Sequence, residues 1–328
     1  MRSQLPARIT DQTILLAVLA ERINEYTNHA HGALAANTER AYRADTAFFT
    51  KWCAEQGLSS LPASPETIAS FVDDVNQTRK PATVRRYLAG INKLHIAAGL
   101  PSPTRDEIVR LAVKRMNRMH GTRQEQAAPL NRNVIDKMIA ATGGDLIDLR
   151  DVALINLAYD TLCRRSEIVA IDVDDVSTDE DGNGTVLIRR SKTDQEGAGD
   201  VRFLAASTIQ AIKRWTSAAG ISEGALFRSV SKGNKVAARI SARDVSRIFK
   251  KMACRAAVEA HWISGHSTRV GASQDMAAAG LGLVEIMQSG GWKSPAMVGR
   301  YTERLMARRG AAARLAALQG RTTLTHEA

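Results

Sequence analysis

The chain has 328 residues, 44% of them hydrophobic, and its 45 lysines and arginines outnumber its 34 aspartates and glutamates, giving a formal net charge of +11. This length predicts two domains with apolar cores, and the composition excludes a disordered protein. The charge indicates a polyanionic partner: nucleic acid is favoured over a membrane surface, and a merely basic soluble enzyme is the alternative.

The cysteines and the apolar runs narrow the class of protein further. Cys53, Cys163 and Cys254 are far apart and lack C-x-x-C spacing, which indicates a reducing compartment and argues against disulfides or a zinc site. The sequence has neither a His/Asp/Glu cluster at ligand spacing nor a phosphate-loop motif, so we expect no metal and no cofactor. Residues 14–20 are apolar but too few to span a bilayer. We expect a cytoplasmic, nucleoid-associated protein without a membrane segment.

The first third of the chain shows only helical periodicity. One predicted helix has a single apolar face, made of Ile14, Leu15, Val18, Leu19, Ile23 and Tyr26. Further helices are expected over residues 38–56, from Ser64 as N-cap, over 81–98, and from Thr104 through Met116. No strand pattern interrupts them, so residues 10–119 are predicted to form an all-helical domain.

Basic residues cluster on three of these predicted helices, with few acidic residues beside them. They are Arg40, Arg43 and Lys51; Lys80, Arg85, Arg86 and Lys93; and Arg110, Lys114, Arg115 and Arg118. A charge run is usually a solvated surface, but several basic faces in one domain are typical of a protein that follows a phosphate backbone. We therefore expect this domain to contact DNA, with Arg43, Arg85 and Arg86 as candidates.

Residues 120–130 lose the periodicity and are interpreted as a linker, which leaves residues 131–328 as the second domain. Helices are expected there over 131–141 and 146–162. Arg164 and Glu167 follow, spaced i, i+3, a pattern that by itself predicts only a weak surface ion pair. Because the preceding segment is strongly apolar, Arg164 is expected to be partly buried, and a buried arginine requires a partner.

The β signal is confined to residues 185–188 and 201–204, two short runs joined by a polar, glycine-containing loop that carries Lys192. Helices are expected again over residues 207–219, with Trp215 in the core, and over 241–260. The second of these is strongly basic, and Arg243 and Arg247 lie near its start. It is long enough to enter the major groove of DNA.

The C-terminal part reads as three helices separated by glycine turns. The first covers 267–279, the second 283–289, and the third opens at Ser294-Pro295. His266 and Arg269 share a face beside the N-terminus of the first helix, which favours a phosphate. Tyr301, about two turns into the third helix, would reach the same pocket if the helices fold back on one another. His-x-x-Arg also occurs at residues 120–123, so the pattern alone is not specific.

Seven residues carry a family resemblance through their order and spacing: Arg164, Glu167, Lys192, His266, Arg269, Trp292 and Tyr301. Together they resemble the active-site series of the tyrosine recombinases, the phage integrase family. The segments TLCRRSEI, SGHSTRVGASQDMAAAG and EIMQSGGW are similar to the Cre-like subgroup, and the resemblance covers nearly the whole chain. It implies a mainly α fold, with an all-helical core-binding domain before a mostly helical catalytic domain that contains a small β-hairpin.

The resemblance implies that Tyr301 attacks a DNA phosphate to form a 3′-phosphotyrosine, without metal or ATP. Arg164 and Arg269 would then clamp the non-bridging oxygens, and Lys192 would protonate the leaving 5′ oxygen. His266 would assist proton transfer around Tyr301.

Two further residues of the series have implied supporting roles. Glu167 matches the acidic position of the family and would orient the site rather than attack. Trp292 stands where many members have a second histidine. Its indole N–H donates a hydrogen bond but cannot shuttle a proton, so its implied role is positioning.

The resemblance also implies an assembly. Two domains would clamp double-stranded DNA, and a homotetramer on two inverted-repeat sites would exchange strands through a Holliday junction, with accessory proteins not required and a monomer in solution compatible with this. A C-terminal helix at about 306–318 would dock on a neighbouring subunit. Arg243 resembles a base-contacting position in Cre-like recombinases, whereas Ala82 and Ser246 depart from that subgroup, so a different target site is expected.

Two alternatives remain. A type IB topoisomerase shares the nucleophile chemistry but relaxes DNA as a monomer, and the exchangeable C-terminal helix argues against it. A DNA-binding protein that keeps the fold without the chemistry would be favoured by the loss of Arg164, Lys192, Arg269 or Tyr301, and all four are present.

Overall fold

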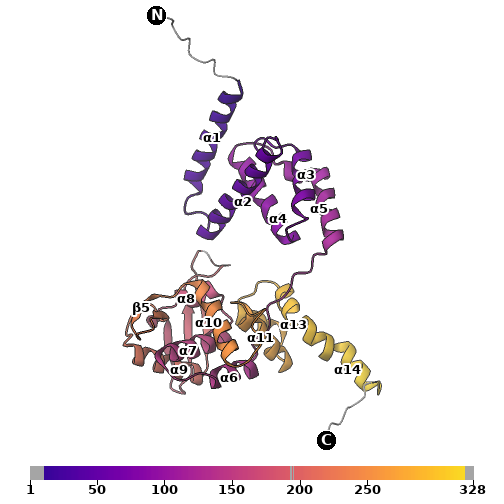
Figure 1. Ribbon diagram of the computed structural model, residues 1–328. Helices are drawn as coiled ribbons and strands as arrows, with labels where there is room; N and C mark the ends of the chain where they lie inside the picture. Colours follow the sequence, from indigo (N-terminus) through magenta and orange to yellow (C-terminus); the bar gives the residue numbers. More distant parts are fainter. Residues whose placement is uncertain (1–10, 193, 195, 322–328) are drawn as a thin grey trace, which may run out of the picture. The chain divides into compact units, whose positions relative to one another are not determined.

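The computed structural model describes residues 11–192, 194 and 196–321, and the chain divides into two compact units between Glu125 and Gln126 (Figure 1). Both units are built mainly from helices, and the described part of the second also contains five short strands. The prediction of a mainly α fold is therefore confirmed. Within the described residues, no helix is long and apolar enough to cross a membrane.

Over its described residues, from Asp11 onward, the first unit contains five α-helices. They are α1 (Asp11–Ala30), α2 (Ala36–Glu55), α3 (Pro65–Val75), α4 (Pro81–Ala97) and α5 (Glu107–His120). Its core is aromatic: the Phe71 ring on α3 meets Phe49 and Trp52 of α2 edge-on, with ring centroids 5.1 and 5.2 Å apart. Phe49 and Trp52 are three residues apart on α2, so they share the face of that helix that packs inward.

Two expectations for this unit were wrong in detail. The fifth helix begins at Glu107, because Asp106 rather than Thr104 is its N-cap and accepts a hydrogen bond from the Ile108 N–H. Thr104 lies in a short 3₁₀ turn instead. On α1, Leu19 is buried and Ile23 and Tyr26 are half-buried, but Ile14 and Val18 are 52% and 40% exposed, so the predicted apolar face is only partly covered.

The buried histidine of this unit makes its stability depend on pH. His95 Nε2 accepts from the Ala63 N–H at 3.1 Å, and Nδ1 lies 2.9 Å from the Ile91 carbonyl, so the neutral Nδ1–H form fits both partners. Burial lowers the pKa of His95 below its ordinary value of 6.5, although the Ile91 carbonyl opposes this. The unfolded chain therefore binds the extra proton first, and stability is lost as pH falls through 6.5.

We expect this loss to reach at most about 2 kcal/mol at pH 5, since each pH unit below the unfolded pKa costs about 1.4 kcal/mol. Hydrogen exchange of peptides from α4, corrected for intrinsic rates, measures it at pH 5 and pH 7.5. In His95→Gln, whose amide can replace both hydrogen bonds without titrating, the difference between the two pH values should disappear. An equal difference in both proteins would assign the acid sensitivity to other groups.

The second unit contains nine α-helices and five strands among its described residues. The helices are α6 (Arg132–Ala140), α7 (Leu146–Thr161), α8 (Arg165–Ala170), α9 (Ala206–Ala219), α10 (Ala242–Arg255), α11 (Ser267–Ala278), α12 (Leu283–Gly290), α13 (Pro295–Arg309) and α14 (Ala311–Leu318). The strands are β1 (Val176–Thr178), β2 (Gly184–Ile188), β3 (Asp200–Leu204), β4 (Arg228–Val230) and β5 (Val236–Arg239).

The predicted hairpin, β2 with β3, is one part of a three-stranded antiparallel sheet in the order β1-β2-β3. Ile188 pairs with Asp200, so the segment that follows β2 starts at the end of the sheet. Three strands were not expected from the sequence: β1, β4 and β5. Each has only three or four residues, too few for an alternating pattern to stand out.

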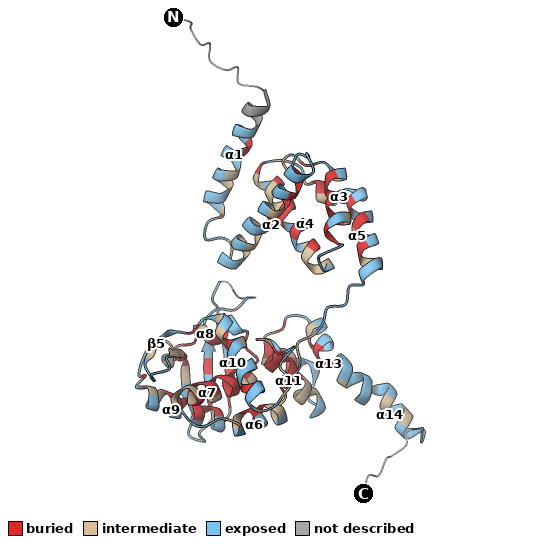
Figure 2. Cartoon of the chain, viewed as in Figure 1, coloured by how far each residue is buried: buried red, intermediate tan, exposed pale blue. Residues whose placement is uncertain are grey.

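The core of this unit surrounds α7, which Figure 2 shows as mostly buried. Trp215 of α9 is fully buried there, as expected, and donates to the Leu226 carbonyl at 2.8 Å. The basic helix α10 ends at Arg255, five residues earlier than residue 260, the expected end. Arg239, which lies just before that helix, belongs to β5 and binds the Asp172 carboxylate.

The end of the chain differs from the single helix expected at about 306–318. Residues 306–309 complete α13, and Gly310 separates them from α14. No residue of α14 is buried, and Leu315 and Leu318 are 52% and 87% exposed. The helix therefore presents unpartnered leucines to solvent.

Candidate active site

The turn after α7 places Arg164. Leu162 ends that helix with a φ of 52°, and its carbonyl accepts a hydrogen bond from Arg269 Nη1. Two residues later, the Arg164 N–H donates to Glu167 Oε2 at 2.8 Å and its Nη1 donates to Oε1 at 2.7 Å. Glu167 is only 6% exposed, so this is a sheltered pair rather than a surface ion pair. The carboxylate fixes both the backbone and the guanidinium of Arg164.

Arg269 is the most enclosed charge of the site, with 2% of its surface exposed. Its Nη2 donates to the Gly290 carbonyl at 3.2 Å, and its guanidinium carbon lies 4.7 Å from the centre of the Trp292 ring. Burial lowers the pKa of Arg269, and the nearby charge of Arg164 adds to this. An arginine stays protonated even so, and the site therefore holds two adjacent positive charges that an anion would stabilise.

Trp292 and Tyr301 form the wall beside Arg269. Their rings meet edge-on with centroids 5.6 Å apart, and both residues are less than a tenth exposed. The Tyr301 backbone carbonyl accepts from Gln274 Nε2 at 3.0 Å, which ties α13 to α11. A side chain on Gly290 would collide with the Trp292 ring, so the turn needs glycine there.

Lys192 and His266 lie at the edge of this arrangement, and both are exposed. The Lys192 N–H donates to Glu167 Oε1 at 3.4 Å, which joins its loop to the Arg164 pair. The pKa of His266 is lowered first by desolvation of the ring among its neighbours. The positive charges of Arg269, Arg165, Arg164 and Lys192 lower it further.

One pocket of about 400 Å³ gathers four of the seven predicted residues, since Arg164, Glu167, Arg269 and Trp292 all line it. Tyr301 adjoins it through Trp292, and Lys192 through Glu167. The pocket is also lined by Arg202, which sequence reasoning missed. The available signal was a charged residue that alternates with Val201 and Phe203 along a strand.

The predicted DNA-contacting arginines differ in how free they are. Arg243 and Arg247 are exposed on the first turns of α10, where Arg247 Nη1 also donates to Asp244 Oδ1 at 3.3 Å, and Arg43 is exposed on α2. Arg85 donates to Asn117 Oδ1. Arg86 binds the buried Asp45 carboxylate through two hydrogen bonds of 2.9 and 2.8 Å. A guanidinium engaged in this way has less freedom to bind a phosphate.

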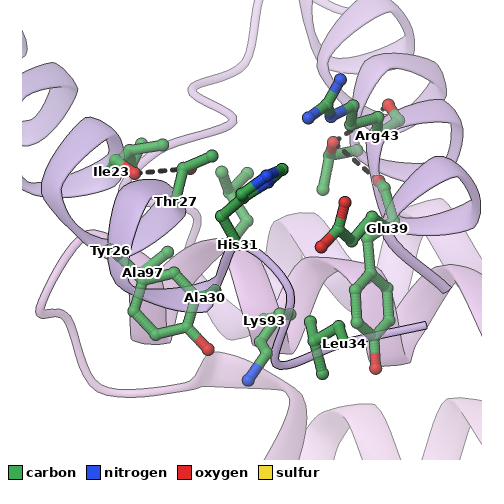
Figure 3. A pocket seen from close by; sticks show the side chains of 14 residues that line it. Ile23, Tyr26, Thr27, Ala30, His31, Leu34, Glu39, Arg43, Lys93 and Ala97 are labelled. Atoms are coloured by element: carbon green, nitrogen blue, oxygen red, sulfur yellow. Dashed lines mark hydrogen bonds between the residues drawn. The ribbon is translucent and has the colours of Figure 1, made fainter. Parts of the chain in front are cut away.

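A separate pocket of about 170 Å³ lies in the first unit, among α1, α2 and α4 (Figure 3). Of all the predicted site residues, only Arg43 lines it, together with apolar side chains such as Ile23 and Leu34. We assign the chemistry to the pocket around Arg164. Among the described residues, no group of three or more His, Cys, Asp or Glu side chains could hold a metal ion.

Comparison with known proteins gives consistent matches. Residues 128–308 match the phage integrase family. The chain is 32% identical over 283 residues to an integrase/recombinase XerD homologue of Selenomonas ruminantium, covering 81% of each chain. It is 33% identical over 287 residues to the recombinase Cre of Escherichia phage P1, covering 80% of this chain and 83% of that protein.

Solved structures share the fold at low sequence identity. A lambda integrase dimer bound to a core site matches with a TM-score of 0.60 and 15% identity, over 86% of this chain and 94% of that one. The integrase of transposon Tn1549 in complex with a circular-intermediate DNA matches with a TM-score of 0.62 and 12% identity, over 89% and 99%.

Proposed function

The chain belongs to the phage integrase family and is a site-specific recombinase of the tyrosine class, and from this premise we propose that Tyr301 cleaves DNA at inverted-repeat sites, one strand per subunit. The observation that carries the proposal is the pocket in which Arg164, Glu167, Arg269 and Trp292 converge beside the Tyr301 ring. Two positive charges at a sheltered pocket suit a phosphate diester that gains negative charge during the reaction.

In the proposed reaction the Tyr301 oxygen bonds to phosphorus as the bond from phosphorus to the 5′ oxygen breaks. The product is a 3′-phosphotyrosine, which preserves the bond energy for rejoining. Arg164 and Arg269 bind the non-bridging oxygens, and each is pre-oriented: Arg164 by Glu167, and Arg269 by the Leu162 and Gly290 carbonyls. Fixed donors stabilise the developing charge without reorganising.

Proton transfer falls to the two exposed residues at the pocket edge. Lys192 gives a proton to the leaving 5′ oxygen, and His266 assists the removal of the Tyr301 proton. The lowered pKa of His266 supports this role, because a neutral imidazole can accept a proton near pH 7. Trp292 holds Arg269 and Tyr301 in place through ring contacts.

DNA recognition is proposed to use α10 and the basic face of the first unit. Arg243 and Arg247 are exposed at the start of α10, where a helix in the major groove meets base edges. Arg43 and Arg85 contribute phosphate contacts. Arg86 is proposed to act in part by holding Asp45, and through it the packing of α2 on α4.

Assembly is proposed to occur as a homotetramer on two sites, with strands exchanged through a Holliday junction and no accessory protein required. The exposed leucines of α14 support an exchange of this helix between subunits. An apolar groove of about 580 Å³, lined by residues that include Leu281, Leu283 and Met306, offers an acceptor of matching character on the same unit. In solution without DNA, a monomer is compatible with the weakly anchored helix.

Exchange of α14 predicts that Leu315→Gln/Leu318→Gln binds one DNA half-site normally but loses most of the cooperativity that joins subunits. Glutamine keeps the helix propensity of leucine and removes the apolar contact. Gel shifts and mass photometry on DNA that contains a full site would measure this cooperativity. The matched control is Ala312→Gln/Ala317→Gln, on the same helix, which should assemble like the parent. Equal cooperativity in the leucine variant and the alanine control would exclude a role for the two leucines.

The experiment that tests the proposed function is covalent trapping. The protein is incubated with DNA of its own replicon, denatured in detergent and digested, and the DNA ends that carry a 3′ adduct are sequenced. Adducts gathered at one inverted-repeat sequence would support site-specific recombination and identify the target. Adducts scattered without preference would favour the topoisomerase alternative, and specific binding without adducts would leave a silent DNA-binding protein.

A further inference from the structure

Strand β3 turns two apolar residues, Val201 and Phe203, outward and the charged Arg202 inward. Val201 and Phe203 are 61% and 60% exposed, whereas Arg202 between them is only 9% exposed. Strand residues alternate between faces, so the register that buries Leu204 also buries Arg202. Burying a guanidinium in place of available apolar side chains is costly, and it persists only where partners compensate.

The partners of Arg202 come from both sides of the active-site pocket. Its Nη1 donates to the carbonyls of Gln288 and Ser289 at the C-terminus of α12, and its Nη2 binds the Asp200 carboxylate. The C-terminal carbonyls form the negative end of the helix dipole, which favours a cation there. A side chain on Gly291 would collide with Nη2. Among the described residues, none accepts from its buried Nε.

Arg202 thereby connects two parts of the site. One is the β2–β3 hairpin, which carries Lys192, and the other is the turn after α12, which carries Trp292. Other contacts also hold the turn after α12, because Arg269 binds the Gly290 carbonyl and Trp292 packs on Tyr301. On the hairpin side, Lys192 is tied to the pocket by a long hydrogen bond of 3.4 Å from its N–H to Glu167. Loss of Arg202 would therefore displace the hairpin more than the turn after α12.

On the basis of the function proposed above for Lys192, we propose that Arg202 is a positioning residue, which docks β3 on the C-terminal carbonyls of α12 and so holds Lys192 within reach of the leaving 5′ oxygen. Arg202 itself does not transfer the proton. Its effect on cleavage passes through Lys192.

A change of leaving group isolates this effect. In ordinary DNA the bond from phosphorus to the 5′ oxygen breaks, and the oxygen takes a proton from Lys192. In a 5′-bridging phosphorothiolate the bond from phosphorus to sulfur breaks instead, and sulfur leaves as a thiolate. A thiol has a pKa of about 8.5, far below that of an alcohol, so the thiolate leaves without a proton donor. A residue that acts through Lys192 is needed only for the oxygen substrate.

The test compares Arg202→Met with Lys192→Ala in single-turnover cleavage of both substrates at the mapped site, with Arg164→Ala as the reference for a phosphate-binding defect. We expect Arg202→Met and Lys192→Ala to cleave ordinary DNA about 100-fold more slowly than the parent. On the phosphorothiolate both should come within about threefold of the parent, whereas Arg164→Ala should stay slow on both substrates.

An equal defect of Arg202→Met on the two substrates would overturn the proposal. If thermal melting shows that Arg202→Met does not fold, Asp200→Asn removes the carboxylate partner and should give a smaller defect confined to ordinary DNA; a defect of equal size on both substrates would overturn it. Failure of the phosphorothiolate to rescue Lys192→Ala would overturn both the positioning role and the role of Lys192. The absence of Tyr301-dependent adducts in the parent would instead overturn the proposed function.

Discussion

We expect Tyr301→Phe to bind its DNA site as tightly as the parent and to form no covalent adduct. The ring keeps its packing on Trp292, so the change removes only the hydroxyl that is proposed to attack phosphorus. Loss of a catalytic nucleophile lowers turnover on the order of 10⁶-fold in a well-studied hydrolase, and we expect a loss of that scale here. Gel-shift affinity and detergent-stable adducts on the mapped site measure binding and chemistry separately.

Tyr159→Phe is the matched control for this prediction. Its hydroxyl donates to Asp275 Oδ2 at 2.6 Å, in a network with the Arg132 N–H rather than in the pocket. Removing that hydroxyl should cost about 1 kcal/mol of stability and leave adduct formation intact. Adducts that persist in Tyr301→Phe would show that another residue is the nucleophile, and the assignment of the pocket would then be wrong.

Arg164→Ala should slow strand cleavage at saturating protein by about 10² to 10³-fold, the usual effect of removing one donor that stabilises transition-state charge. The truncation also removes the guanidinium that pairs with Glu167, so Arg164→Lys is the second variant: it keeps the positive charge but not the planar fork. Its rate should lie between those of the parent and the alanine variant. Single-turnover kinetics on the mapped site give both rates.

The adjacent Arg165 supplies the control, because its side chain is exposed whereas that of Arg164 is held by the Glu167 carboxylate. Arg165→Ala removes the same charge one residue away. It should weaken DNA binding and make the affinity less steeply dependent on salt, because one phosphate contact fewer releases fewer counterions, and it should leave the saturated cleavage rate within about threefold of the parent. Similar cleavage defects in both variants would mean that net charge rather than the Arg164 position matters.

Most helices could be predicted because their signals are local. Ser64 and Ser294 cap α3 and α13, as their sequence context indicates, and each accepts a hydrogen bond within three residues. The short strands could not be predicted in the same way. β1 pairs with the next strand, β2, and β4 pairs with β5, but three or four residues contain too little alternating pattern to reveal such a strand.

The seven proposed catalytic residues could be identified from residue type and spacing, but Arg202, which is proposed to position Lys192, could not. Arg202 escaped notice because the alternation of Val201 and Phe203 predicts that these two face inward. The structure reverses the faces, since the carbonyls of α12 and the Asp200 carboxylate compensate the buried charge.

By itself, the sequence determined the helical class, the order of the seven candidate residues and the basic character of α10, because periodicity, caps and composition act within a few residues of the chain. Only the tertiary structure decided which charges are free and which are engaged. Arg86 meets Asp45 across 41 residues, and Arg202 meets Gln288 across 86. Such pairs form when folding brings distant segments together and removes water from between them, and no local pattern records which partner that will be.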